Sequence, residues 1–469
     1  MQSALNVSGA KKVPSKRYYI FIVCFIAAMG GLLFGLDQGF INGSLSFIQK
    51  EMGFSTAQGE NFASILLYGC IIGAFISGFI SRLIGRKNTL VITALFFTFF
   101  SLLGAITHSI DVLYISRFCL GLAVGVASFV VPLYLSEIAP THLRGGFIAM
   151  YQQMITVGIF LIYVSNSVIA YYFQSWRIML AVIAIPAFIM LLGCFFIPKT
   201  PRWLMLKGKD EKALEVLNKT RNDQKEIIDE IASIKETVKT KNKFNFSLIT
   251  SGFVLKVLAL GVLLQFLQQL SGINAVIYYS TNIFTSAGFD NPSIATVVVG
   301  LVNMLTTLIA VFFVDKIGRK PIIYFGLVLM IITLVTIGYL FYSQTEGVEL
   351  NATEKSVMLG SCLLYILAFA VSLGPIIWII CAEIFPLEVR DFGLTVTTMA
   401  NWIGATIVVR FSLTIMDKFG GYSLFFIFAI CCILGIFLVK YFVPETKDVS
   451  LETIEKNLKK GIKLKNIGA

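Results

Sequence analysis

The feature that most restricts the fold of this chain is a series of apolar runs of about 20 residues, the length of α-helix that crosses about 30 Å of hydrocarbon. About twelve such runs, separated by short polar stretches, occur between Tyr18 and Tyr441. Hydrophobic residues make up 57% of the 469 residues and charged residues 14%, so most of the chain is suited to contact with lipid. We therefore predict an all-α membrane protein with transmembrane helices over residues 18-41, 62-81, 89-107, 112-135, 147-171, 177-197, 253-283, 294-314, 321-342, 357-382, 392-413 and 422-442.

The basic residues lie at the ends of these runs and indicate how the chain is oriented. They precede the first run and recur in every second loop, including the lysine-rich segment 199-250, whereas the other loops are poorer in them. By the positive-inside rule, both termini are expected in the cytoplasm. Orientation also explains the net charge of +12 better than nucleic-acid binding does. The first run has no small-residue cleavage site, so we expect a retained helix in a multi-pass protein of a bacterial inner membrane.

Three pairs of similar segments occur in the same order in the two parts of the chain. They are GFISRLIGRK (78-87) with VFFVDKIGRK (311-320), EIAPTHLR (137-144) with EIFPLEVR (383-390), and PKTPRWL (198-204) with PETK (444-447). An ordered internal repeat of this kind predicts two similar six-helix bundles.

We place the N-terminal bundle at 1-198, cytoplasmic linker helices at 199-250, the C-terminal bundle at 251-444 and a cytoplasmic tail at 445-469. In the linker, apolar residues at helical spacing predict short amphipathic helices; they are Ile227, Ile231, Ile234 and Val238. Whether this linker is a solvated connector or a gating element stays open.

These loop motifs, together with QQLSGINAVIYYSTNIF at 268-284, resemble the sugar porter family of the major facilitator superfamily over nearly the whole chain. The chain is similar in particular to bacterial sugar/proton symporters and facilitative glucose transporters. The resemblance implies parallel bundles with a site between them near the bilayer midplane, alternating access, and a hexose or pentose as substrate.

One ionisable residue lies deep in the first apolar run, Asp37 in GGLLFGLDQGF. A carboxylate at the bilayer centre costs roughly 2.5–3.5 kcal/mol or more, so such residues usually mark a functional pathway. Gly31, Gly35 and Gly39 form a stripe for close packing, and Asp37 points away from it. Arg117 is a second charge in an apolar run, beside its own glycine stripe.

Asp37 and Arg117 together can act as a charge switch, because a proton on the acid would release the arginine. The resemblance implies that Asp37 is the proton-coupling residue, since uniporters of the family carry an uncharged residue there. The alternative is a fixed salt bridge without proton traffic.

A sugar is uncharged and its hydroxyl groups both donate and accept, so amides and aromatic faces suit it. The apolar runs contain such groups: Gln152, Gln268, Gln269, Asn274, Asn303, Trp378, Asn401 and Trp402. By resemblance, all but the last two match sugar contacts of the family, and Tyr278 with Tyr279 match its outer gate. Ser271 and Gly272 are expected to break one helix, and Gly374 and Pro375 to form a gating hinge in another. Taken singly, each amide could equally be an interhelical hydrogen bond.

The repeated loop motifs carry charges that the resemblance implies form a cytoplasmic network between the two halves, which closes the inner face when the site opens outward. Its expected members are Arg86, Glu137, Arg144, Asp315, Arg319, Glu383 and Arg390. Two positions depart from the pattern: Arg82 replaces the aspartate of the wider superfamily, and Lys199 stands where the family more often has glutamate. The alternative is that these charges only set the orientation of the chain.

Other classes of function find no support in the sequence. The eight cysteines lie in apolar runs without metal-ligand spacing, and the chain has only two histidines. We predict no enzyme chemistry, no cofactor and no metal; the expected partners are a sugar, a proton and the lipid bilayer, with the monomer as the working unit. The remaining rivals are a facilitative sugar uniporter, an inositol or polyol symporter, and a non-transporting sugar sensor.

Overall fold

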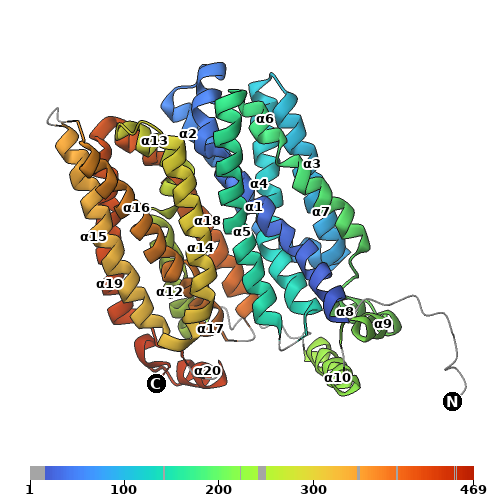
Figure 1. Ribbon diagram of the computed structural model, residues 1–469. Helices are drawn as coiled ribbons and strands as arrows, with labels where there is room; N and C mark the ends of the chain where they lie inside the picture. Colours follow the sequence, from blue (N-terminus) through green and yellow to red (C-terminus); the bar gives the residue numbers. More distant parts are fainter. Residues whose placement is uncertain are drawn as a thin grey trace, which may run out of the picture.

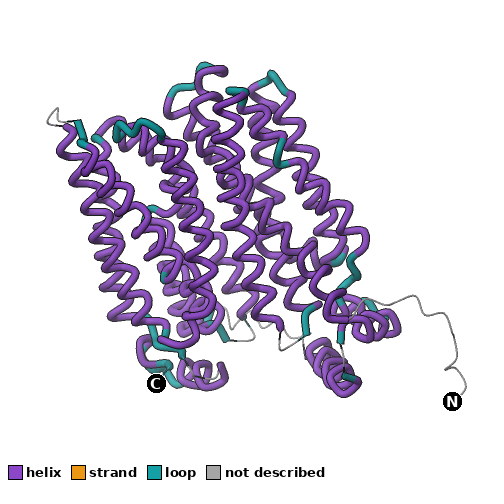
Figure 2. Tube along the Cα trace, viewed as in Figure 1, coloured by secondary structure: helices purple, strands orange, loops and turns teal. Residues whose placement is uncertain are grey.

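A computed structural model describes residues 16–140, 143–221, 223–240, 250–345, 349–386, 389–447, 449 and 451–468. Regular structure in these ranges is helical throughout (Figure 2). Within the described residues, twelve stretches are long and apolar enough to span a membrane, one over each predicted run, which confirms the all-α prediction.

The first six spans are α1 (Lys16–Met52), α2 (Thr56–Ile84), α3 (Arg86–Ile106), α4 (Ile110–Ile138), α5 (Arg144–Tyr172), and α6 (Trp176–Ala181) followed by α7 (Ala184–Phe196). The second six are α12 (Gly252–Leu270) followed by α13 (Ile273–Ser286), α14 (Pro292–Ile317), α15 (Arg319–Thr345), α16 (Ala352–Val371) followed by α17 (Leu373–Ile384), α18 (Arg390–Phe419) and α19 (Gly421–Phe442). We call these two sets the N-half and the C-half; they lie side by side in Figure 1.

Short helices gather at one end of the two halves. The linker forms α8 (Pro201–Leu206), α9 (Asp210–Thr220) and α10 (Gln224–Thr240) beside the N-half, and α20 (Leu451–Lys459) lies beside the C-half (Figure 1). We call this end of the molecule the linker face and the opposite end the far face. Ile227 and Ile234 are buried, as expected for amphipathic linker helices.

Glycines bring neighbouring helices of the N-half into backbone contact. A Cβ atom at Gly35 of α1 would lie 1.9 Å from the carbonyl oxygen of Ile155 in α5, and one at Gly121 of α4 would lie 1.9 Å from that of Leu66 in α2. Only glycine fits at this separation. The predicted stripe of α1 therefore packs on α5, and it leaves the other faces of α1 for different partners.

Two spans of the C-half are broken near the middle of their length. Between α12 and α13, Gly272 adopts a left-handed φ of 98°, which allows the turn expected at Ser271 and Gly272. Between α16 and α17 the break lies at Ser372, two residues before the expected Gly374 and Pro375. Proline has no N–H to donate and its ring crowds the carbonyl four residues earlier, so the distortion appears upstream of Pro375.

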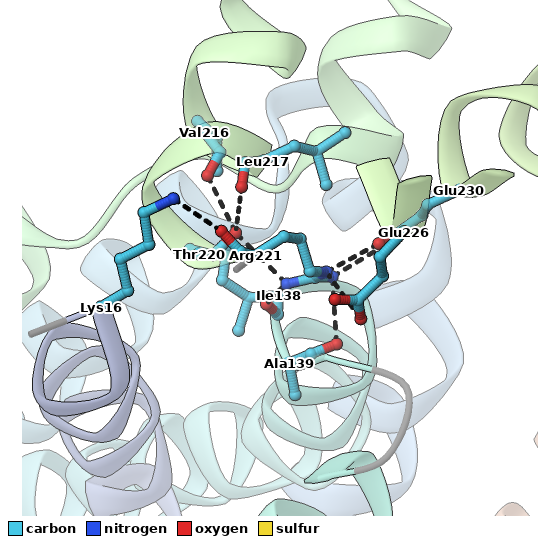
Figure 3. Close-up of polar contacts among 9 residues, drawn as sticks. All are labelled: Lys16, Ile138, Ala139, Val216, Leu217, Thr220, Arg221, Glu226 and Glu230. Atoms are coloured by element: carbon cyan, nitrogen blue, oxygen red, sulfur yellow. Dashed lines mark hydrogen bonds and ion pairs between the residues drawn. The ribbon is translucent and has the colours of Figure 1, made fainter. Parts of the chain in front are cut away.

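Arg221, between α9 and α10, attaches the linker to the N-half (Figure 3). Its fully buried guanidinium donates to the carbonyls of Ile138 (2.8 Å) and Ala139 (3.1 Å) at the end of α4, and forms two hydrogen bonds with Glu230 (2.7 and 2.9 Å). Its own carbonyl accepts from the Lys16 ammonium at the start of α1 (2.9 Å). One side chain thus caps α4 and attaches the junction of α9 and α10 to the N-half.

Candidate transport site

A buried charge pair lies inside the N-half. Nη1 of Arg117 in α4 is 2.5 Å from Oδ1 of Asp37 in α1, and both side chains are completely buried. The guanidinium also lies over the rings of Phe40 and Phe62, at 5.2 and 5.6 Å from their centroids. Oδ2 of Asp37 and two nitrogens of Arg117 have no hydrogen-bond partner among the described residues. Burial of two charges with a single contact between them is costly, because the remaining polar atoms have lost their water.

A chain of hydrogen-bonded amides begins on the same turn of α1 and runs into the C-half. Nε2 of Gln38 donates to Oδ1 of Asn274 in α13 (2.7 Å), and Nδ2 of Asn274 donates to Oε1 of Gln269 in α12 (2.5 Å). Nε2 of Gln269 then donates to Oδ1 of Asn401 in α18 (3.1 Å). All four residues are at most 8% exposed, so the chain is a buried polar path across the molecule.

The amide chain continues to the broken helix of the C-half. Nδ2 of Asn401 donates to Oε1 of both Gln265 and Gln268 (2.6 Å each). Nε2 of Gln268 donates to the carbonyls of Leu373 and Gly374 in the first turn of α17 (2.7 and 3.1 Å). The amides of this chain therefore bind mainly to one another and to the start of α17.

Three residues spaced four apart on α1 form the face that meets the C-half. The ring of Phe34 packs on Trp402 (centroids 5.5 Å apart), Gln38 binds Asn274, and Asn42 binds α13. A spacing of four residues keeps side chains on one side of a helix. α1 therefore has three faces. Its glycines pack on α5, Asp37 contacts α4, and the face with Phe34, Gln38 and Asn42 meets the C-half.

Toward the far face, the two halves are joined directly at a kink in α1. Nδ2 of Asn42 donates to the carbonyl of Ile277 (2.9 Å) and to Ser280 (2.5 Å), and its Oδ1 accepts from the N–H of Thr281 (3.0 Å). The hydroxyl of Tyr163 in α5 donates to the same Ile277 carbonyl (2.5 Å).

A second contact between the halves at the far face uses a buried acid. Glu60 near the start of α2 accepts hydrogen bonds from the N–H and the hydroxyl of Thr414 in α18, and Arg410 lies 3.4 Å from it. Glu60 is fully buried, although it lies in the second turn of its helix. Together with the Asn42 contacts, this arrangement joins the two halves at the far face.

At the linker face, the repeated motifs form ion pairs within each half. Arg86 binds Glu137 (2.8 Å) in the N-half, and Arg319 binds Glu383 (2.9 Å) in the C-half. Arg390 donates to the carbonyl of Phe385 in its own half (3.4 Å). Nε of Arg144 is buried without a hydrogen-bond partner among the described residues, and the side chain of Asp315 lies outside them.

The other residues expected at the site are placed less uniformly. Asn303, Trp402 and Tyr278 are buried, and the Tyr279 hydroxyl donates to the carbonyl of Val409 (2.7 Å). Gln152 is exposed, and Trp378 is 38% exposed. The buried indole N–H of Trp402 has no hydrogen-bond partner among the described residues.

Sequence reasoning missed four residues that the structure brings into these clusters: Gln38, Asn42, Glu60 and Gln265. Each is a polar residue within or at the edge of an apolar run, and that signal was present. The sequence does not show which helix lies next to each of these residues, so their hydrogen-bond partners could not be predicted.

Comparison with known proteins adds the family. Residues 23–458 match the family model described as "Sugar (and other) transporter". The galactose-proton symporter of Escherichia coli K12 is 42% identical over 98% of both chains, and the arabinose-proton symporter of the same strain is 38% identical over 100% of this chain and 98% of its own.

Solved structures agree with this match. The inward open conformation of the xylose transporter XylE from E. coli has a TM-score of 0.79 at 30% identity, covering 93% of this chain and 99% of its own. XylE bound to 6-bromo-6-deoxy-D-glucose has a TM-score of 0.75 at 30% identity, covering 96% and 99%. This chain is therefore a transporter rather than an enzyme, and it belongs to the sugar transporter family of the major facilitator superfamily.

Proposed function

We propose that this protein carries a hexose or pentose across the inner membrane together with a proton, and that Asp37 carries the proton. The similarity to proton-coupled galactose, arabinose and xylose carriers supports the class of substrate. The observation on which the proposal chiefly rests is a buried Asp37–Arg117 pair that lies one residue along α1 from a chain of sugar-compatible amides.

The linker face is the cytoplasmic face in this proposal, because the basic residues gather there. Since the halves join at the far face through Asn42 and Glu60, the structure corresponds to a carrier closed toward the outside. Residues 1-198 and 251-444 then move as two units around the central site, and a single chain suffices because one chain contains both the acid and the amides.

Protonation of Asp37 removes the negative charge that holds Arg117, and the arginine can then take another position against α1. Deprotonation restores the ion pair. Since each protonation state favours a different packing of α1 on α4, a proton gradient can bias the direction in which the halves rearrange. Moving one charge through 100 mV supplies about 2.3 kcal/mol, which accumulates a neutral solute roughly 50-fold.

In the proposed cycle, the amides of Gln268, Gln269, Asn274 and Asn401 exchange hydrogen bonds with one another for hydrogen bonds with sugar hydroxyls. Trp402 supplies an aromatic face and an unsatisfied N–H beside them. An amide can both donate and accept, so this set suits a hydroxyl-rich neutral ligand better than an ion.

The decisive experiment uses purified protein in liposomes and the variant Asp37→Asn, which keeps a hydrogen-bond acceptor for Arg117. We expect the variant to lose accumulation driven by a proton gradient and to retain sugar exchange. Asp111→Asn, an acid at the exposed start of α4, is the matched control and should accumulate sugar normally. Unchanged accumulation in Asp37→Asn would contradict the proposal that Asp37 carries the proton, and a wild type that exchanges but never accumulates would indicate a uniporter.

A second experiment addresses the substrate. Competition by a panel of hexoses, pentoses and polyols against one labelled sugar would identify it.

A further inference from the structure

We propose that Gln38 is a positioning residue that replaces the sugar in the empty carrier, so that the two halves can close on each other and return without substrate. The inference rests on the proposed sugar site. It concerns a step of the transport cycle that Asp37 and the sugar-binding amides do not by themselves explain.

The first observation is that Gln38 is the member of the amide chain that comes from the N-half. Its Nε2 donates to Oδ1 of Asn274 at 2.7 Å, whereas Asn274, Gln269 and Asn401 all belong to the C-half. Gln38 therefore supplies Asn274 with a hydrogen-bond donor that does not belong to the C-half. A sugar hydroxyl is a donor of the same kind.

The second observation is that the amide chain is already satisfied without a ligand. Asn274 donates to Gln269 at 2.5 Å and accepts from Gln38, so both of its polar atoms have partners. Without Gln38, Oδ1 of Asn274 would face apolar α1 when the halves close on an empty site. A buried acceptor without a partner carries a penalty of roughly 1–3 kcal/mol, which slows a rearrangement roughly fivefold to 150-fold.

The third observation is that Gln38 lies beside Asp37 on α1. Successive residues point about 100° apart around a helix, so the acid faces Arg117 while the amide faces Asn274. A rotation of α1 that withdraws Asp37 from Arg117 also withdraws Gln38 from Asn274, and this exposes Asn274 to a sugar. The deprotonated, ion-paired state is thus the one in which Gln38 fills the sugar's place.

Two kinds of sugar flux distinguish the proposed role of Gln38 in the empty carrier from a role as a sugar ligand or as a structural contact. Equilibrium exchange, with equal sugar and equal pH on both sides, needs only the loaded carrier to rearrange. Efflux into sugar-free medium also needs the empty carrier to return. We expect Gln38→Met, which keeps the length of the side chain and removes the donor, to slow efflux roughly tenfold more than exchange. The KM for exchange should stay within about twofold of the wild type.

Gln153→Met is the matched control. Gln153 also donates across the two halves, to the carbonyl of Met304 at 3.1 Å, but it does not touch the amide chain. Its removal should leave the ratio of efflux to exchange as in the wild type.

Two results would overturn the proposal. A large rise in the exchange KM of Gln38→Met would make Gln38 a direct sugar ligand, and an equal loss of both fluxes per folded protein would make it a structural contact. Neither measurement uses a proton gradient. Failure of the proposed proton coupling would instead appear as missing accumulation in the wild type, so the two failures are distinguishable.

Discussion

The linker-face ends of the two halves contain the same three-residue arrangement but differ in the residue beside it. In the N-half, Glu137 binds Arg86 (2.8 Å) and accepts from the Thr200 hydroxyl (2.6 Å). In the C-half, Glu383 binds Arg319 (2.9 Å) and accepts from the hydroxyl of Thr446 (2.5 Å). The residue before the threonine is Lys199 in the N-half and Glu445 in the C-half.

This one difference changes how each helix end is stabilised. The Glu445 carboxylate accepts the N–H groups of Arg319 and Lys320 at the start of α15, both at 3.0 Å. Lys199 cannot accept; its ammonium lies over the ring of Trp203, 5.0 Å from the centroid, and α3 begins without a side-chain cap.

The N-half is supported instead from the linker, where Arg221 caps the end of α4 one residue after Glu137. The comparison teaches that a repeated motif can keep its charges while the two copies are held in place by different parts of the chain. The C-half uses a carboxylate from the segment after its last span, and the N-half uses a cation from the linker.

The largest effect should come from removing the shared acid, and it should differ between the halves. The Arg86–Glu137 side chains are 9% and 2% exposed, whereas those of Arg319 and Glu383 are 11% and 22% exposed. We expect Glu137→Ala to lower the free energy of unfolding by roughly 3 kcal/mol, because it leaves a buried arginine unpaired. Glu383→Ala should cost about 1–2 kcal/mol. Unfolding midpoints of the purified variants would test this order, and equal or reversed losses would contradict it.

The next effect concerns the linker. Arg221→Ala removes the cap of α4 and leaves Glu230 without its partner, so we expect a loss of about 2 kcal/mol. Hydrogen exchange should become faster in α9 and α10 while the C-half stays unchanged. Lys219→Ala is the control, because its pair with Glu215 is exposed at the surface. If the exchange of α9 and α10 stayed at the wild-type rate, the linker would not depend on Arg221.

The smallest effects should come from the position at which the halves differ. Burial raises the pKa of Glu445, but the N–H donors of Arg319, Lys320, Lys447 and Thr446 together outweigh it and lower the pKa below its usual range. A lowered folded-state pKa gives stability that is present above the unfolded value of about 4.3 and disappears as the pH falls through the folded value. Glu445→Gln should therefore cost about 1 kcal/mol at pH 7, and this difference from the wild type should vanish in acid.

The reverse substitution in the N-half sharpens the comparison. Lys199→Glu should stabilise the N-half by several tenths of a kcal/mol, about as much as an acid at a helix N-terminus contributes. Lys199→Gln separates loss of the lysine from gain of the acid. If Lys199→Glu destabilised the protein, α3 would not be able to use a carboxylate in the way that α15 does.

The fold could be predicted from the sequence because hydrocarbon thickness sets the length of an apolar run. The predicted end of the first span at residue 41 coincides with the kink of α1 at Asn42 and Gly43, and the helix continues beyond this kink to Met52. Asn42 and Ser44 lowered the hydropathy there, yet Asn42 is satisfied by α13 and Ser44 by the carbonyl of Phe40. A polar residue that finds a protein partner can extend a span without contacting lipid.

The site was predictable where one helix carried the signal. The cost of burying Asp37 and Arg117 marked both residues, and the structure places them in contact. Gln38 and Glu60 could not be assigned a place, because their partners lie more than 200 positions away in the sequence. The observed break lies at Ser372 rather than at the predicted Gly374 and Pro375. Pro375 has no N–H for the carbonyl four residues earlier, so the helix is interrupted before the proline.

The packing of Gly35 against Ile155 has a consequence for experiments on movement. Because the backbones of α1 and α5 are in direct contact, we expect these two helices to move as one unit, which separates from the C-half along the Phe34, Gln38 and Asn42 face of α1. A covalent crosslink between α1 and α5 would therefore leave the carrier able to turn over, whereas the same crosslink between α1 and α13 would arrest it.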